Sequence, residues 1–108
     1  MIGSGNYATQ VLIPAFKLTS AILKTVASAS GVSGVHAGKK YGFEETTTDS
    51  ASVLLDASLN TVVVATRHDS HARYVCEALR ARKHIFVEKP LAITRGELDD
   101  IAKTFSEV

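Results

Sequence analysis

The sequence of 108 residues has one cysteine, two prolines and no tryptophan, and it lacks a long apolar run. Because Cys76 is alone, neither an internal disulfide nor a thiolate metal cluster can form within the chain. The longest apolar run, Val62–Ala65, is far shorter than the roughly 20 residues of a membrane helix. The N-terminus also lacks the basic segment of a signal peptide. We therefore expect a cytoplasmic protein with no membrane partner.

Acidic residues are missing from the first part of the chain. None precedes Glu44, whereas the same stretch contains Lys17, Lys24, Lys39 and Lys40. This asymmetry indicates an anionic ligand held by the first half, although chance over a short stretch explains it equally well. A hydrophobic share of 45% and a charged share of 21% are typical of one soluble globular domain, which excludes disorder. We expect no nucleic-acid partner.

Apolar periodicity predicts strands and helices in alternation. Strands are expected at about 23–28, 43–46, 61–66 and 84–87, and helices at about 6–18, 33–41, 50–56, 69–82 and beyond the capping box of Thr94 and Glu97. Pro14 predicts a kink in the first helix or a tightened first half. The run 61–66 is β-branched without polar alternation, which suits a central parallel strand. The pattern predicts an α/β, Rossmann-like fold, with a doubly wound parallel sheet in a single domain.

A glycine-rich segment stands directly before the first predicted helix. Gly3-Ser4-Gly5-Asn6-Tyr7-Ala8 fits the pattern G-x-G-x-x-[G/A] of dinucleotide-binding domains. There the first glycine allows a tight turn, the second lets the backbone approach a pyrophosphate, and the small third residue lets the helix pack on the strand. The helix N-terminus offers free N–H groups to the phosphates. A purely structural turn is the alternative. The candidate cofactor-binding residues are Gly3, Gly5, Asn6, Tyr7 and Ala8.

An acid is missing after the predicted strand at 23–28, which corresponds to the second strand of NAD-binding domains, where an acid usually binds the adenosine ribose. Ser28 and Ser30 stand there instead. Serine hydroxyls can bind a 2′-phosphate, and Lys39 or Lys40 can supply charge, although a solvated helix face explains both lysines as well. We therefore expect NADP or NAD as the cofactor, with NADP favoured.

Two further polar segments follow predicted strands. Thr66-Arg67-His68-Asp69-Ser70-His71 stands where the central strand ends, and ligands of open α/β sheets bind outside the carboxyl ends of strands. From the first turn of its helix, His71 can bind a phosphate or a ribose, unless both histidines there only cap the helix. We interpret His36 and His84 as structural. We expect no metal at His68 and His71, because a third ligand is not evident.

Glu88-Lys89-Pro90 follows the next strand, at the same edge of the sheet. A carboxylate there can accept hydrogen bonds from both hydroxyls of a ribose. The neighbouring ammonium can polarise a substrate hydroxyl or orient a nicotinamide. Pro90 restricts Lys89 to an extended conformation. A solvated loop is the alternative.

Together the three segments resemble the N-terminal NAD(P)-binding domain of the Gfo/Idh/MocA family, the glucose–fructose oxidoreductases and inositol dehydrogenases. The resemblance covers essentially the whole chain and is most specific at His84 to Leu91. It implies that Glu88 binds the nicotinamide ribose and that Lys89 is the catalytic residue beside the nicotinamide. It also implies that residues 66–68 border the middle of the cofactor and that His71 lies near its phosphates.

Two features depart from the family pattern. Arg67-His68 replaces the usual Pro-Asn, and together with Asn6-Tyr7 it resembles members fused behind a zinc-type alcohol dehydrogenase module. Family members also carry a second α/β domain and a first strand of about five residues. We therefore expect this chain to be truncated at the first strand and to lack the substrate domain.

The resemblance implies an NAD(P)-dependent oxidoreductase that moves a hydride between the nicotinamide and a secondary alcohol or carbonyl of a sugar- or cyclitol-like small molecule. We expect a homo-oligomer, and no activity from this chain alone. The alternatives are a non-catalytic nucleotide-sensing module and a Rossmann domain for another adenine ligand, such as coenzyme A. Glu88-Lys89-Pro90 argues against both, since a pure binder has no evident need for Lys89.

The expected strand order, 3-2-1-4-5, places the first strand between residues 23–28 and 61–66. Only Met1 and Ile2 are present to fill that position. We therefore expect a slot with unpaired backbone groups in the middle of the sheet. Another chain would fill this slot, or the two neighbouring strands would close on each other.

Overall fold

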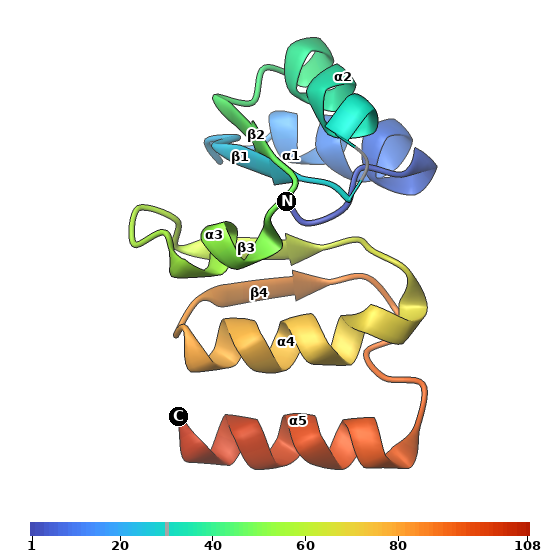
Figure 1. The fold of residues 1–108 in the computed structure, drawn as a ribbon, viewed down its shortest axis with the longest axis vertical. Coiled ribbons are helices and arrows are strands. Elements are labelled where there is room, and N and C mark those ends of the chain that lie inside the picture. The colour runs from blue at the N-terminus through green and yellow to red at the C-terminus, as the bar shows by residue number, and fades with distance from the viewer. Residues whose placement is uncertain (30) are drawn as a thin grey trace.

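The computed structural model describes residues 1–29 and 31–108, so Ser30 lies outside the described residues. The strands are β1 (Thr25–Ala27), β2 (Glu45–Thr47), β3 (Thr61–Val64) and β4 (His84–Val87). The helices are η1 (Ala8–Leu12), α1 (Ile13–Lys17), α2 (Gly31–Tyr41), α3 (Ser50–Leu55), η2 (His68–Ser70), α4 (His71–Arg80) and α5 (Arg95–Glu107). The alternation of strands and helices that the periodicity predicts is confirmed (Figure 1).

Two parallel strand pairs, β1 with β2 and β3 with β4, are joined through the first residues of the chain. Ile2 forms parallel bridges to Ala27 on one side and to Val64 on the other. The Ile2 N–H donates to the Val63 carbonyl at 2.8 Å, and the Ala27 N–H donates to the Met1 carbonyl at 2.8 Å. The order is therefore β2, β1, the Ile2 segment, β3, β4, as the sequence predicts. Figure 1 shows the N-terminus between the two pairs.

The core gathers around this junction. Ile2 is only 2% exposed, and the central strand side chains Val62 and Val64 are fully buried. Val53 of α3 and Ala78 of α4 pack against them. Such β-branched side chains suit a strand that is covered on both faces. Helix α5 packs on α4 through Ile101, which forms a second cluster with Ala72, Val75 and Cys76. Figure 1 shows α4 between the β3–β4 pair and α5.

Pro14 is accommodated by a widened helical turn. The residues before it form the π-helical segment η1, in which the Ile13 N–H donates to the Ala8 carbonyl, and α1 then begins with Pro14 in its first turn. Proline has no N–H to donate, and its ring collides with the carbonyl one turn earlier in a regular α-helix. A π-turn gives the ring room without ending the helix. The predicted disturbance at Pro14 is thus a local change of helix type.

Candidate functional site

The glycine-rich segment lies against the end of β3. Gly3 has a φ of +104°, and a Cβ there would lie 2.7 Å from the Ala65 carbonyl carbon, too close for any side chain. Gly5 is different, because it is exposed and a Cβ would meet no atom within 4 Å. Ala8 is 1% exposed, which fits a small residue at the contact between helix and strand. The fold thus explains Gly3 and Ala8, but contacts within the chain do not explain Gly5.

Asn6 and Tyr7 are exposed in the first turn of the helix that follows. Backbone N–H groups in a first helical turn have no partner within the helix and can bind an anion. The Thr9 N–H, by contrast, already donates to the Gly5 carbonyl at 3.0 Å. The open side of this turn therefore consists of the exposed residues Gly5, Asn6 and Tyr7.

The segment after β3 forms a compact turn that leads into α4. The hydroxyls of Thr66 and Ser70 lie 2.6 Å apart, and the Ser70 hydroxyl donates to the Arg67 carbonyl at 2.8 Å. Thr66 is half-buried, whereas Arg67 and His68 are exposed. This turn lies next to the glycine-rich segment, because Gly3 faces the Ala65 carbonyl. It can therefore border a ligand that binds at Gly5.

His71 is placed differently from the sequence expectation. Its side chain is fully buried, with Nε2 2.9 Å from the Thr66 carbonyl oxygen and Nδ1 2.8 Å from the Pro90 carbonyl oxygen. Both ring nitrogens are thus engaged by backbone, and neither is open to a phosphate or a ribose. The expected phosphate contact is corrected to a link between two loops. The sequence shows a histidine in a first helical turn, but not that the ring points inward.

The third segment continues directly from β4. The Glu88 N–H donates to the Val64 carbonyl at 3.1 Å, which extends the pairing of β3 and β4 by one bond. Glu88 is half-buried and Lys89 is exposed, and the peptide bond between Lys89 and Pro90 is cis. The structure thus brings the glycine-rich segment, the turn after β3 and the segment 88–90 together at the carboxyl ends of the strands.

Ser28 follows β1 at the same edge and is half-buried, and its N–H donates to the Thr47 carbonyl at 3.0 Å. A Cβ on Gly34 would lie 3.2 Å from the Ser28 Cβ, so the first turns of α2 lie close to Ser28. Sequence reasoning did not single out Gly34, although glycines at positions 34 and 38 of one helix indicate close packing of that helix.

Lys39 and Lys40 lie in the last turn of α2. At a rise of about 1.5 Å per residue, Lys39 stands roughly 7–8 Å further along the helix axis than Gly34, the residue of α2 beside Ser28. Both lysines are exposed, and the Lys40 ammonium lies 5.4 Å from the centre of the Tyr41 ring. That these lysines supply charge to a ligand at Ser28 stays a prediction.

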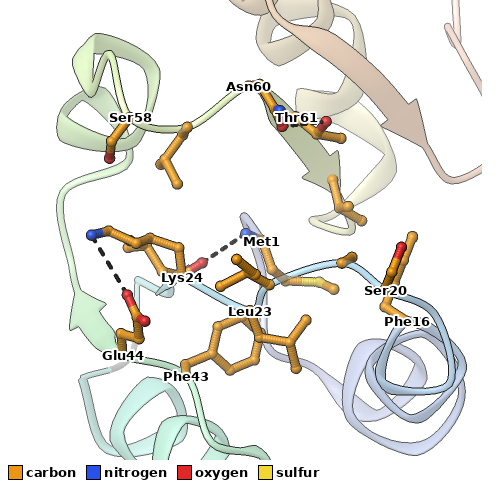
Figure 2. Close-up of a pocket in the computed structure, with 15 residues that line it drawn as sticks. Met1, Phe16, Ser20, Leu23, Lys24, Phe43, Glu44, Ser58, Asn60 and Thr61 are labelled. Atoms are coloured by element: carbon orange, nitrogen blue, oxygen red, sulfur yellow. Dashed lines mark hydrogen bonds and ion pairs between the residues drawn. The ribbon is translucent and has the colours of Figure 1, made fainter.

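A cavity of about 540 Å³ lies at the opposite end of the strands (Figure 2). Met1, Leu23, Thr25, Thr61 and Val63 are among the residues that line it. It occupies the expected slot, and β1 and β3 do not close on each other there. The Met1 amine donates to the Thr25 carbonyl at 2.8 Å, and burial lowers its pKa from 8.0 to about 6. This cavity is separate from the candidate site at the carboxyl ends.

In residues 1–29 and 31–108, the histidine, cysteine, aspartate and glutamate side chains form no group of three or more that could hold a metal ion. No helix among the described residues is long and apolar enough to cross a membrane.

Comparisons with known proteins agree with this geometry. The model of a family described as "Oxidoreductase family, NAD-binding Rossmann fold" matches residues 1–108. Levoglucosan dehydrogenase of Pseudarthrobacter phenanthrenivorans is 37% identical over 76 residues, which are 70% of this chain and 20% of that protein. The chain therefore spans about a fifth of the length of this relative.

Two solved structures are similar over 98% of the chain. The 3-ketoreductase KijD10 from Actinomadura kijaniata, in complex with NADP and TDP-benzene, has a TM-score of 0.87 at 25% identity, and the match covers 33% of that chain. A levoglucosan dehydrogenase in complex with NADH and L-sorbose has a TM-score of 0.85 at 29% identity, and the match covers 30% of that chain. Both similarities extend over essentially all of the elements described above.

Proposed function

The chain belongs to the Gfo/Idh/MocA family of oxidoreductases, and from this membership we propose that it binds NAD(P) at the carboxyl ends of β1, β3 and β4. Gly5, Asn6 and Tyr7 would face the pyrophosphate, and residues 66–68 would border the middle of the cofactor. Glu88 would accept hydrogen bonds from the nicotinamide ribose. The observation that carries the proposal is the exposed Gly5, which the fold itself does not require.

We propose NADP as the favoured cofactor because of the residue that follows β1. Ser28 stands after β1, where an acid would bind the 2′-hydroxyl of NAD and repel the 2′-phosphate of NADP. Its hydroxyl can donate a hydrogen bond to a phosphate oxygen. Charge from Lys39 or Lys40, in the last turn of α2, would add to this preference. Of the similar structures, KijD10 is in complex with NADP and the levoglucosan dehydrogenase with NADH, so relatives use both forms.

For the protein to which this domain contributes, we propose an NAD(P)-dependent oxidoreductase that acts on a sugar- or cyclitol-like secondary alcohol. The bound nicotinamide would accept the hydride from the alcohol carbon. Lys89 is exposed beside Glu88, where its side chain can assist the loss of the hydroxyl proton. Related proteins include levoglucosan dehydrogenase and the myo-inositol 2-dehydrogenase of Thermotoga maritima. This chain spans about a fifth of those proteins, so we expect no turnover from it alone.

Calorimetric titration of the chain with NADP⁺, NAD⁺ and coenzyme A tests the binding proposal. We expect Gly5→Ala to weaken NADP⁺ binding at least about tenfold, because the added methyl group keeps the pyrophosphate from the backbone. Gly96→Ala is the matched control, since a Cβ there would meet only the Thr94 hydroxyl, at 3.8 Å, and Gly96 is not among the residues assigned to the site. Equal NADP⁺ affinities for the two variants, or tighter binding of coenzyme A, would contradict the proposal.

A further inference from the structure

The ring of His71 joins the two loops that carry the candidate site. It lies 2.9 Å from the Thr66 carbonyl oxygen, in the turn after β3, and 2.8 Å from the Pro90 carbonyl oxygen, in the segment after β4. The side chain is fully buried, so water does not compete for these contacts. A carbonyl oxygen only accepts hydrogen bonds, so the neutral ring donates one of the two bonds and the doubly protonated ring donates both. The edge of the His68 ring, with its centroid 5.6 Å away, packs beside it.

The His71 ring connects the two segments beyond the point where the β3–β4 pairing ends. The β3–β4 ladder runs to Val64 and Val87, and its last backbone bond joins the Glu88 N–H to the Val64 carbonyl. Beyond that point the two chains separate into loops, and the ring of His71 is the connection between them that the structure describes. Because its two partners are backbone atoms, the ring fixes the paths of both loops rather than the side chains on them.

The segment 88–90 is consequently held at both ends. The Glu88 N–H is tied to β3, and the Pro90 carbonyl is tied to α4 through His71. Lys89 stands between these two anchors with an exposed side chain. A reactive group on a flexible loop loses entropy each time it is aligned, whereas a group between two anchors starts near its working position.

We propose that His71 is a positioning residue that sets the distance of Glu88 and Lys89 from the turn after β3, and so governs binding of the nicotinamide half of the cofactor. The proposal rests on the cofactor site proposed above. It assigns no contact between His71 and the cofactor itself. The adenosine and pyrophosphate half would be held by Gly5, Asn6 and Tyr7, which His71 does not touch in the described contacts.

Comparison of two ligands separates positioning from a general structural role. The first is NADP⁺, and the second is 2′-phospho-ADP, which keeps the adenosine and pyrophosphate half but lacks the nicotinamide and its ribose. We expect His71→Gln to raise the Kd of NADP⁺ roughly tenfold or more and the Kd of 2′-phospho-ADP less than about threefold, since the lost hydrogen bonds anchor only the nicotinamide side. The control is His36→Gln, in the exposed part of α2, which should change neither constant. Equal rises in Kd for both ligands with His71→Gln would contradict the proposal and would show that His71 has only a general structural role.

A measurement on the unaltered chain covers the case in which His71→Gln does not fold. In the cofactor-free chain, nuclear magnetic resonance should show ring N–H protons of His71 that exchange slowly with water, whereas the exposed His36 and His84 rings should exchange fast. A fast-exchanging His71 ring would overturn the proposal, whatever the chain binds. If the wild type binds neither ligand, the proposed function fails, and slow exchange of the ring would still establish the link.

Discussion

Gly3 and Gly5 of the glycine-rich segment are glycines for different physical reasons. Gly3 needs its positive φ and the absence of a Cβ because it lies against the Ala65 carbonyl, whereas Gly5 has open space around it. The first is therefore a requirement of the fold, and the second is available to a ligand. A sequence pattern treats them alike, and only the structure separates them.

Gly3→Ala should accordingly lower the free energy of unfolding by about 2–4 kcal/mol, through a strained φ and a steric overlap with β3. Gly42→Ala is the control, because Gly42 has a φ of +78° but no atom within 4 Å of a Cβ. Gly42→Ala should lower the free energy of unfolding by only about 1–2 kcal/mol, because alanine is strained in the left-handed conformation. Urea unfolding measures both values, and similar losses would mean that the contact with β3 is unimportant.

Part of the site could be predicted at the level of residues. The glycine-rich segment and residues 88–90 were placed at strand ends by local pattern, and the structure brings them to one edge of the sheet. The role of His71 could not be predicted, because the direction of its ring depends on a carbonyl 19 positions away.

Among the elements, α5 has the strongest local signal in the chain. The Thr94 hydroxyl accepts a hydrogen bond from the Glu97 N–H at 3.1 Å, and the Glu97 carboxylate accepts one from the Thr94 N–H at 3.2 Å. Thr94→Ala should destabilise the chain by about 1 kcal/mol in urea unfolding, because the helix loses the side-chain half of its cap. Ser106→Ala, near the exposed end of the same helix, should stay within about 0.5 kcal/mol of wild type. An unchanged free energy of unfolding for Thr94→Ala would show that tertiary packing alone stabilises α5.

Element type was easier to predict than element detail. Helices and strands followed from period and capping residues, which act over a few neighbours. The strand ends shifted by up to two residues, because strand limits depend on the partner strand. The π-helical segment η1 was not predicted: Pro14 led us to expect a kink or a tightened first half, whereas the helix widens before it. The strand order was predicted because only a short list of parallel arrangements is compatible with alternating strands and helices.

At the scale of the whole molecule, the buried N-terminus links stability to pH. The pKa of the Met1 amine is lowered from 8.0 to about 6 by burial, so the unfolded chain binds the proton more tightly. The stabilisation is fully present above pH 8 and is lost as the pH falls towards 6. Two pKa units correspond to about 2–3 kcal/mol, which should appear as a rise in the free energy of unfolding between pH 6 and pH 8.

Acetylation of the Met1 amine provides the control for this pH dependence. The acetylated chain carries no titrating group at that position, and the cavity beside Met1 offers room for the added atoms. Its free energy of unfolding should therefore lack this rise between pH 6 and pH 8. An unmodified chain with the same pH profile as the acetylated one would contradict the assignment to Met1.

The pairing of Ile2 with residues 27 and 64 also has a consequence for the order of folding. Each strand pair, with its helices, can form from contacts that are closer in sequence than those of Ile2 with Val64. The segment at Ile2 must close a much longer loop to reach β3, and loop closure is an entropic cost that precedes any gain from the contact. We therefore expect the segment at Ile2, which joins the two halves of the sheet, to dock only after each strand pair has formed.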